Sequence, residues 1–311
     1  MDLGSDPAIS GGAVTNNGTN GLEVDSGSLT TDGFWDDKDI VYVTKGDITV
    51  PEGTTLTVGQ GQVVKAGNYN YDLFINGILD ATGIVSDHIV FTSLLDDAAG
   101  GDTNNNGTTS PATANWGRIE VGSSGSATME YVDIRYGGGS GSPVTHLYVN
   151  QGDLTFRNST TQYSHGYGIR IQGSDPVLED NTYSNNNGAA VSMDINSSPA
   201  ISGATITDNG TNGLEIDGGT LDGDRYWDDS DIVYVTMGDI TVPVGITLTI
   251  GPGLIIKLAA LTTIFWLMEP LRPMALLQPP SYSPKSTMTV PAATPTMVAA
   301  YPSPAAGAQS G

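Results

Sequence analysis

Apolar side chains recur at a fixed spacing through the middle of the chain. Pairs of apolar residues separated by one position return every 22 or 23 residues. They are Leu147/Val149, Ile169/Ile171, Val191/Met193 and Leu214/Ile216. Such alternation predicts short β-strands with one buried face, and the Asn, Gly, Ser and Asp residues between them predict turns. A coil of this length that repeats one apolar column predicts a parallel β-helix with inward side chains stacked from coil to coil.

The N-terminal part of the chain follows the same pattern with tighter coils. No segment before residue 254 has the 3.6-residue periodicity of a helix. The expected strands are Ile40–Val43, Ile48–Val50, Thr55–Val58, Val63–Lys65, Leu73–Ile75 and Ile89–Phe91. The predicted fold is therefore all-β, a parallel β-helix (solenoid) over residues 1–258.

A second, longer period lies over the first. The stretch 7–65 reappears without a gap at 199–257, always 192 positions later. DIVYVTKGDITVPEGTTLTVG at 39–59, for example, becomes DIVYVTMGDITVPVGITLTIG at 231–251. Self-similarity at a long period is typical of repeat architectures, in which each unit packs on its neighbours. We expect the chain to be a window cut from a longer array, with neighbouring repeats as partners.

An ordered series of motifs resembles a known group of proteins. DITVPEGTTLTVGQGQVVK is followed by DLFINGILDATG, IVFTS, GGDTNNNG and NWGRIEVG. This series resembles the right-handed parallel β-helix repeat proteins of the pectin-lyase-like superfamily, of the bacterial secreted or surface type. The resemblance covers about residues 5–258. It implies the fold more strongly than an activity, because that superfamily includes polysaccharide lyases and hydrolases as well as non-catalytic surface modules.

The charge balance narrows the range of partners. The chain has 34 acidic residues against 11 basic ones, and a formal net charge of −23 at pH 7. Such an acidic surface excludes nucleic acid and anionic membranes as favoured partners and suits cations. There is no Cys, so disulfides and thiol chemistry are excluded. Met1 is not followed by the basic and apolar segments of a signal peptide. We expect a secreted or cell-surface protein whose signal lies upstream of a truncated start.

The composition changes after Leu258. Residues 259–311 contain no Asp or Asn and are rich in Pro and Ala, so we expect no ordered structure there. Read in another frame, TIFWLMEPL at 263–271 can become DDLLVDGTL, which matches YDLFINGIL at 71–79. Residues 292–299 can become GGDTNNGG, which matches 100–107. We predict that a frameshift near residue 258 replaced the natural continuation. The apolar run 254–268 is too short for a membrane span, so no membrane insertion is expected.

One loop carries a calcium-type pattern. Asp102, Asn104 and Asn106, followed by Gly107, fit the first half of a calcium loop, in which alternate oxygen side chains converge on a hard cation. The nearby Asp96 and Asp97 complete the candidate metal site. The pattern departs from an EF-hand because Thr113 stands where that loop has its bidentate Glu. The alternative interpretation is a polar turn that binds no metal.

The predicted register places polar side chains on the outer face of the coils. Asp194 and Asp217 are expected to be neighbours, with Arg170 and Glu215 beside them. In the lyases that the chain resembles, acidic residues bind calcium and a basic residue abstracts a proton; in the hydrolases, clustered Asp residues act as acid and base. These four residues are the catalytic candidates. An acid-rich solvated face is the alternative.

Aromatic and imidazole side chains supply the last candidates. Trp35 and Trp227 each precede two Asp residues, so they could stack on a sugar ring, but burial at the end of a coil is the interpretation we favour. The same interpretation applies to Trp116. The three histidines, His88, His146 and His165, have no metal-ligand spacing and are expected to be structural or solvated.

These observations favour a non-catalytic module. A catalytic groove needs one set of acid and base residues, whereas this chain repeats much of its surface every 192 residues. We therefore expect an extracellular repeat module for adhesion or glycan contact, with an extracellular polysaccharide or a cell-surface molecule as partner and calcium as a stabilising ion. The alternative is a polysaccharide lyase or glycoside hydrolase that acts through the outer-face carboxylates.

Overall fold

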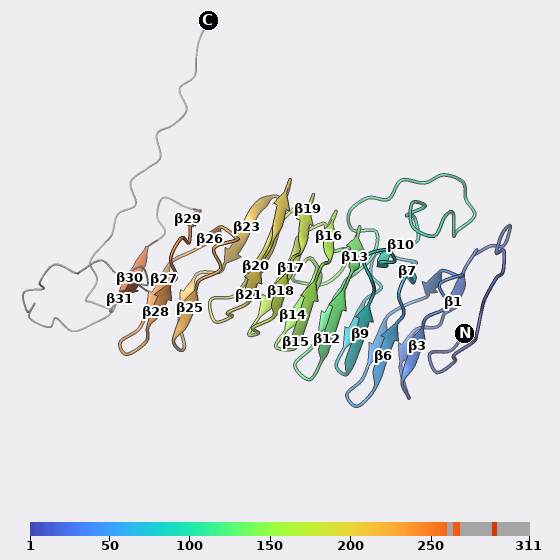
Figure 1. Cartoon of the computed structure of the whole chain (residues 1–311), viewed down its shortest axis with the longest axis horizontal. Coiled ribbons are helices and arrows are strands. Elements are labelled where there is room, and N and C mark those ends of the chain that lie inside the picture. The colour runs from blue at the N-terminus through green and yellow to red at the C-terminus, as the bar shows by residue number, and fades with distance from the viewer. Residues whose placement is uncertain (260–263, 268–287, 291–311) are drawn as a thin grey trace, which may run out of the picture.

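The chain folds as a long stack of β-coils. The computed structural model describes residues 1–259, 264–267 and 288–290. Within these residues there is no helix, and neighbouring strands in every sheet run parallel except β28 and β31. Figure 1 shows the coils succeeding one another along the long axis, from β1 near the N-terminus to β29 and β30. The predicted right-handed parallel β-helix is confirmed.

Three long sheets run along the stack, and as far as β22 successive strands join them in turn. The first sheet contains β1 (Leu22–Val24), β4 (Tyr42–Thr44), β7 (Val63–Ala66), β10 (Ile89–Ser93), β13 (Val132–Arg135), β16 (Thr160–Gln162), β19 (Thr182–Ser184) and β22 (Thr205–Thr207). The second contains β2 (Gly27–Ser28), β5 (Ile48–Val50), β8 (Leu73–Ile75), β11 (Ile119–Val121), β14 (Thr145–Asn150), β17 (Tyr167–Gln172), β20 (Ala189–Met193), β23 (Thr211–Ile216), β26 (Tyr234–Thr236) and β29 (Ile256–Leu258). The third contains β3 (Gly33–Trp35), β6 (Thr55–Val58), β9 (Ile78–Thr82), β12 (Ser126–Glu130), β15 (Asp153–Arg157), β18 (Val177–Glu179) and β21 (Ala200–Ser202).

Two short sheets replace the first and third near the C-terminal end of the described coils. One contains β24 (Gly219–Thr220), β27 (Ile240–Val242) and β30 (Phe265–Leu267), and the other β25 (Arg225–Trp227), β28 (Leu248–Ile250) and β31 (Met288–Val290). β30 and β31 lie in the tail, where the sequence predicts no structure. β30 pairs with β27 in the register that β8 adopts on β5, since Ile240 faces Phe265 as Ile48 faces Leu73. The other tail positions of the frameshift prediction lie outside the described residues.

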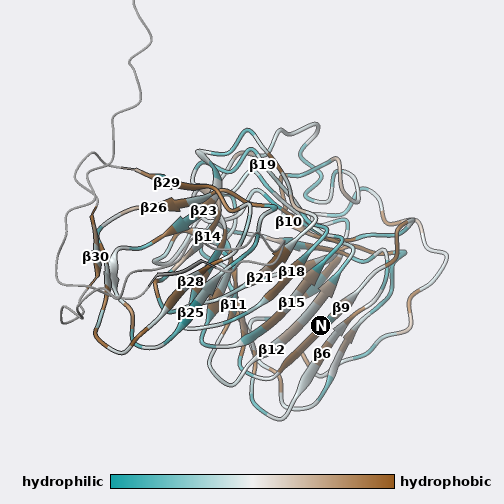
Figure 2. Cartoon of the chain, turned by 60° about the vertical axis from the view of Figure 1, so that its left-hand side comes forward, coloured by the Kyte–Doolittle hydropathy of each residue, from teal (hydrophilic) through white to brown (hydrophobic). Residues whose placement is uncertain are grey.

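The core is the stack of inward side chains that the 22-residue period predicts. Leu147, Ile169 and Val191 face one another on β14, β17 and β20, and all three are fully buried. Burying each such side chain contributes about 2 kcal/mol, and strands about 4.8 Å apart keep the column in contact. Figure 2 shows the apolar positions as brown segments along the strands, separated by paler or teal turns. The inward columns are therefore the main source of stability.

The chain bends between each strand of the third sheet and the next strand of the first sheet, and polar residues occupy equivalent positions in these bends. Asn158, Asp180 and Gly203 occupy equivalent bends, and all three have a positive φ. The next residue at the middle bend, Asn181, accepts a hydrogen bond from the Ser159 amide at 3.0 Å and donates one to the Phe156 carbonyl at 2.7 Å. Such side-chain amides satisfy backbone groups that the bend leaves outside the ladders. Asn residues at these turns are therefore part of the scaffold.

The 192-residue repeat does not contain a whole number of coils. Leu22–Val24 forms β1, and the equivalent residues Leu214–Ile216 end β23, so one unit spans twenty-two strands, or seven three-stranded coils and one further strand. As a result, β1 belongs to the first sheet and β23 to the second. Equivalent strands of the two copies therefore belong to different sheets of the stack.

The predicted strands agree with the observed ones to within two residues at either end. The largest difference is at Ile40–Val43, where the strand is Tyr42–Thr44. Ile40 donates its amide to the Asp37 carbonyl at 3.0 Å and thus belongs to a turn. No helix in the described part of the chain is long and apolar enough to cross a bilayer.

Candidate functional site

The two tryptophans of the repeated motif lie in the core. Trp35 and Trp227 are 1% and 0% exposed, and their rings pack on Tyr42 and Tyr234 with centroid separations of 5.8 and 5.6 Å. Their strands β3 and β25 direct alternate side chains inward, so the indoles fill the coil. The prediction that these residues are buried is confirmed. They are not available to stack on a ligand.

The second Asp of each motif ties neighbouring coils together. Asp37 accepts hydrogen bonds from the Ile9 amide at 2.8 Å and the Tyr42 hydroxyl at 3.0 Å. Asp229 accepts the same pair from Ile201 and Tyr234, at 2.7 Å each. Burial raises the pKa of the Asp229 carboxyl. Both carboxylates thus have a structural role, which the internal repeat shows twice.

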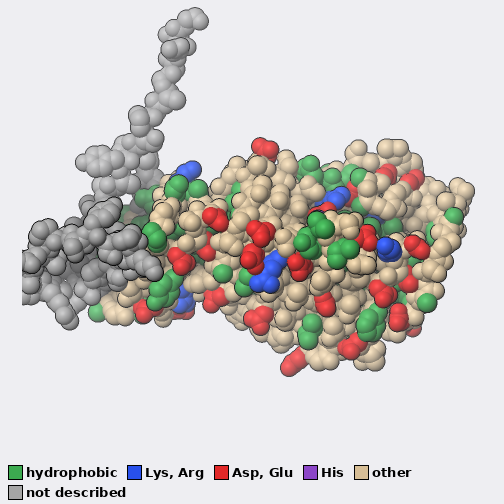
Figure 3. Space-filling view, viewed as in Figure 1, with side chains coloured by type: hydrophobic (Ala, Val, Ile, Leu, Met, Phe, Trp, Pro, Cys, Tyr) green, Lys and Arg blue, Asp and Glu red, His purple; other side chains and the backbone are tan. Residues whose placement is uncertain are grey.

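The aromatic residue before each tryptophan points the other way. Phe34 is 42% exposed and Tyr226 is 63% exposed, at equivalent positions of the two copies. Exposed carboxylates follow each ring in the sequence: Asp36 and Asp39 in the first copy, Asp228 and Asp231 in the second. We call each set an aromatic–acid ledge. The second ledge borders an open groove of about 400 Å³ that also contains Ser198, Ser202 and Ser230. Figure 3 shows one face of the molecule, on which acidic side chains are widely scattered and basic ones few.

The loop that carries the calcium-type pattern covers an outer face of the first sheet. The connection from β10 to β11 extends from the coils toward the N-terminal end of the stack (Figure 1). At its base lies Lys65, which is fully buried. The Lys65 Nζ donates hydrogen bonds to the Gly101 carbonyl and the Thr103 hydroxyl, each at 2.8 Å. Burial lowers the pKa of Lys65, while the neighbouring Asp96, Asp97 and Asp102 oppose that shift. An ammonium group therefore lies among the predicted calcium ligands.

Two of the candidate calcium ligands, Asp96 and Asp102, already accept hydrogen bonds from other groups of the protein. Asp96 accepts from the Thr92 hydroxyl at 2.8 Å and lies 3.8 Å from Arg135. Asp102 accepts from the amides of Asn106 and Gly107, at 3.2 and 2.9 Å. Within the described residues no three His, Asp or Glu side chains are placed to hold a metal ion.

Two oxygens of the same loop lack a partner among the described residues. They are Oδ1 of Asp97 and Oδ1 of Asn104, and both atoms are buried. The other oxygen of Asp97 accepts from the amide and the hydroxyl of Thr109, at 2.6 and 2.9 Å. Asn106 is exposed. Buried acceptors without a donor are uncommon in folded proteins and are the natural ligands of a water molecule or a cation.

The outer-face candidates lie in the register that the sequence predicts. Met193 on β20 pairs with Ile216 on β23, so that Asp194 and Asp217 follow as neighbours, and Arg170, Ser192 and Glu215 form one column. The Arg170 guanidinium donates to both carboxylate oxygens of Asp217. Asp194 accepts from the amides of Gly173 and Asn196, at 2.9 and 3.1 Å. Glu215 accepts from the Thr211 hydroxyl at 2.6 Å.

This column is less exposed than the sequence indicates. Tyr148, Arg170, Ser192 and Glu215 are all buried. Long side chains lying along the sheet cover one another, which a prediction based on alternation alone does not include. The structure therefore brings together the four catalytic candidates, which are Arg170, Asp194, Glu215 and Asp217. Each of them already has hydrogen-bond partners within the protein.

Comparison with known proteins agrees with this architecture. Residues 144–231 match the family model described as a right handed beta helix region. These residues run from the start of β14 to the second Trp-Asp-Asp motif, and their strands from β14 to β23 belong to the three long parallel sheets. The described coils thus form a right-handed parallel β-helix. Searches of curated proteins and of solved structures gave no significant match.

A second open groove on the β-helix lies beside Glu215. It has a volume of about 530 Å³ and contains His165, Tyr167 and Asn187 in addition to Glu215. Gly166 forms part of its lining, and a Cβ at that position would collide with the backbone carbonyl of the preceding coil. Because Gly166 has no side chain, the floor of the groove at this point is formed by backbone. The sequence contains no motif for this groove, since its residues come from successive coils.

The three histidines of the β-helix have different environments. His146 is fully buried, accepts a hydrogen bond from the Gly137 amide at 2.8 Å, and stacks on Trp116 with centroids 6.3 Å apart. Burial lowers its pKa to about 3, so the ring is neutral at pH 7. His88 lies 3.3 Å from Asp133, and His165 is exposed. Their separate positions agree with a structural or solvated role.

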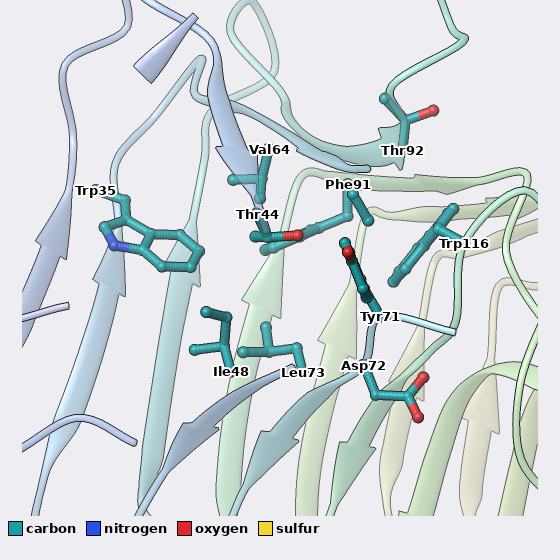
Figure 4. A pocket seen from close by; sticks show the side chains of 11 residues that line it. Trp35, Thr44, Ile48, Val64, Tyr71, Asp72, Leu73, Phe91, Thr92 and Trp116 are labelled. Carbon is teal, nitrogen blue, oxygen red and sulfur yellow. The ribbon is translucent and has the colours of Figure 1, made fainter. Parts of the chain in front are cut away.

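The interior of the β-helix contains a small cavity between Trp35 and Trp116. Figure 4 shows the side chains around it, with Ile48 and Leu73 below and Phe91 and Tyr71 toward Trp116. Its volume of about 30 Å³ holds no more than a water molecule. Asp72 lies at its edge and accepts from the Ser140 hydroxyl at 2.6 Å. This cavity is a packing defect and is too small to be a ligand site.

Proposed function

We propose that the β-helix is a non-catalytic extracellular repeat module that contacts glycans through its aromatic–acid ledges. The observation that carries the proposal is the exposed ring at the same position of both copies, Phe34 and Tyr226, next to a tryptophan that is buried. A flat apolar ring can stack on a sugar face, and adjacent carboxylates can accept hydrogen bonds from its hydroxyls. The exposed ring is kept at the equivalent position of both copies, although the residue changes from Phe34 to Tyr226.

The charge of the β-helix indicates which glycans fit. A net charge of −23 repels polyuronates and other anionic chains. The ledges combine an apolar ring with exposed carboxylates, for example Tyr226 with Asp228 and Asp231. Neutral hexose chains, and chains with free amino groups, suit this combination. A cell-surface or extracellular polysaccharide of this kind is the partner we propose, and the same proposal places the protein outside the cell.

The rival function is that of a polysaccharide lyase or glycoside hydrolase. The observation in its favour is the 530 Å³ groove, where Glu215, His165 and Tyr167 lie together. Against it, Arg170 pairs with Asp217, and the oxygens of Asp194 accept hydrogen bonds from turn residues. These contacts support a structural role for three of the four catalytic candidates. The repetition of the ledge in both copies favours the module.

The ledge predicts a specific loss of binding in the Tyr226→Ala variant. Titration of the chain with cellohexaose, mannohexaose and a chitosan hexamer should show binding of at least one of them. In a Phe34→Ala background, in which only the second ledge keeps its ring, Tyr226→Ala should weaken that binding about fivefold to tenfold, on the scale of aromatic contacts of about 1 kcal/mol. Isothermal titration calorimetry gives the dissociation constants.

The matched control is Val85→Ala, which removes an apolar side chain that is 76% exposed and lies outside both ledges. It should leave binding unchanged. Equal affinity with and without Tyr226→Ala in the Phe34→Ala background would contradict the proposal. Shortening of any of the three oligosaccharides by the chain, with loss of that activity in Glu215→Gln, would support the enzyme instead.

We propose further that calcium stabilises the loop around Asp97 and Asn104. Their buried Oδ1 atoms are hard oxygen donors without a partner among the described residues, as calcium prefers. Lys65 already neutralises part of the acidic loop, so the affinity for calcium should be modest. We expect about 100-fold excess of calcium over its dissociation constant to raise the free energy of unfolding by about 2.7 kcal/mol.

Thermal unfolding with and without calcium at about 100 times its dissociation constant, set against magnesium, measures this effect. The rise in midpoint should disappear in Asp97→Asn and persist in Asp36→Asn, which changes an exposed ledge carboxylate. An unchanged midpoint in calcium would mean that the loop is a polar turn that calcium does not stabilise.

A further inference from the structure

The two copies of the repeat differ in what covers one outer face. In the first copy, Val41, Val43 and Lys65 point outward from the coil and yet are buried. Residues 100–103 lie over them; they belong to the connection between β10 and β11, which we call the acidic loop. We call the face made by Asn20, Val41, Val43, Val63 and Lys65 the covered patch.

Three kinds of contact hold the loop on the covered patch. Gly100 has a left-handed backbone, with a φ of +67°, and packs so closely on Val41 that a Cβ there would collide with its side chain. The Lys65 ammonium binds the Gly101 carbonyl and the Thr103 hydroxyl. Asn20 donates its backbone amide to the Thr103 carbonyl at 2.6 Å and its side-chain amide to the Asp102 carbonyl at 3.1 Å. Apolar contact, charge and backbone hydrogen bonds thus act together.

The second copy presents the same face with the same chemistry. The equivalent residues, 192 positions later, are Asn212, Val233, Val235, Ile255 and Lys257. Their register is also the same: Val235 lies between Glu215 and Lys257, as Val43 lies between Glu23 and Lys65. We call this set the open patch.

The open patch is accessible where the covered patch is not. Ile255 is 56% exposed, Lys257 is exposed, and both valines are partly exposed. In the covered patch the corresponding Lys65 and Val43 are buried. Apolar side chains around a single cation are therefore left on the surface of an otherwise acidic protein.

We propose that the open patch binds an Asp/Asn/Gly loop of the same chemistry as residues 95–109, carried by a further copy of the repeat unit. The geometry of the covered patch gives the mode of binding. A glycine of the bound loop packs on Val233 and Ile255. The Lys257 ammonium donates hydrogen bonds to a carbonyl and a hydroxyl of the loop, and Asn212 donates to its backbone carbonyls. The loop's carboxylates complement Lys257, which supplies the positive charge of the patch.

The test uses a cyclic peptide of residues 95–109. Thr109 Oγ1 donates to the Leu95 carbonyl at 2.9 Å in the chain, so that closure of the peptide head to tail keeps the ends together as the protein does. The labelled peptide is titrated with the full chain, and binding is followed by fluorescence anisotropy. Lys257→Met should weaken binding about tenfold or more, because a charged hydrogen-bonding partner is lost. Lys38→Met, at an exposed lysine outside the patch, should not.

A second peptide tests the mode of binding. A peptide with Gly100→Ala should bind less well than the parent, since a Cβ at this position would collide with the residue equivalent to Val41. A peptide of scrambled order is the reference. The proposal is overturned if the parent peptide binds no better than the scrambled one, or if Lys257→Met binds it as well as the unmodified chain does. Concentration-dependent self-association that Lys257→Met abolishes, without peptide binding, would identify the occupant as a different surface of a second copy and would also overturn it.

Discussion

Replacing Lys65 with methionine is expected to lower the free energy of unfolding by about 3 kcal/mol. Lys65 is fully buried, its ammonium makes two hydrogen bonds to the acidic loop, and Asp96, Asp97 and Asp102 lie nearby. Methionine has a similar length but no charge, so the loop loses both hydrogen bonds and the carboxylates lose their counter-charge. Chemical denaturation followed by circular dichroism gives the change.

The repeat supplies the control for this substitution. Lys257 occupies the same position in the second copy and is exposed. Lys257→Met should change the free energy of unfolding by less than about 0.5 kcal/mol, as surface substitutions do. The two variants make the same chemical change in the same local sequence. Equal losses in both would contradict the structural role assigned to Lys65 and the exposure of Lys257.

Replacing Trp35 with alanine is expected to cost about 4 kcal/mol. The indole is 1% exposed and packs on Tyr42 inside the coil, next to the small cavity. Its removal enlarges that cavity, and the in-register strands on either side limit how far the coil can collapse. The measurement is the shift in the denaturation midpoint at an unchanged slope.

For the neighbouring residue Phe34, we expect only a small loss of stability. Phe34→Ala removes a ring that is 42% exposed, so the free energy of unfolding should fall by less than about 1 kcal/mol. If Phe34→Ala proved as destabilising as Trp35→Ala, the ring would be part of the core, and the ledge would lose half of its support.

Most of the fold can be predicted from the sequence because every coil repeats one requirement. An inward position must be apolar on each coil, so the 22-residue spacing of Leu147, Ile169 and Val191 is enough to predict that they form a column. The spacing does not indicate how the 192-residue unit fits the coils. That depends on the number of strands per unit, which turns such as Gly203 and Asp208 determine locally. The alternation of apolar and polar residues therefore does not predict that β1 belongs to the first sheet and the equivalent β23 to the second.

The candidate site is harder to predict because it depends on contacts between coils. The sequence predicts that Trp35 is buried, and the alternation that turns it inward also exposes Phe34, but how far that ring is exposed depends on the neighbouring coils. The acidic loop has the spacing of calcium ligands, yet Lys65, which lies among them, is separated from Asp102 by 37 positions in the sequence. Burial of the Arg170 column likewise comes from neighbouring coils.

Successive coils stack in register, so that equivalent side chains meet, and an introduced disulfide can probe this arrangement. Thr128 faces Thr155 on the adjacent coil, and Thr155 faces Val177 on the next. The chain has no cysteine of its own. Adjacent strands lie about 4.8 Å apart, within the range of a disulfide, whereas two steps give about 9.6 Å, which exceeds it.

Under mild oxidation, the Thr128→Cys/Thr155→Cys variant should therefore form an intramolecular disulfide, and Thr128→Cys/Val177→Cys should not. Mass spectrometry of the proteolysed chain identifies the linked peptides. Cross-linking of the first pair alone is the expected outcome. Absence of that disulfide, or equal cross-linking of both pairs, would be incompatible with the in-register stack on which the ledges and both patches depend.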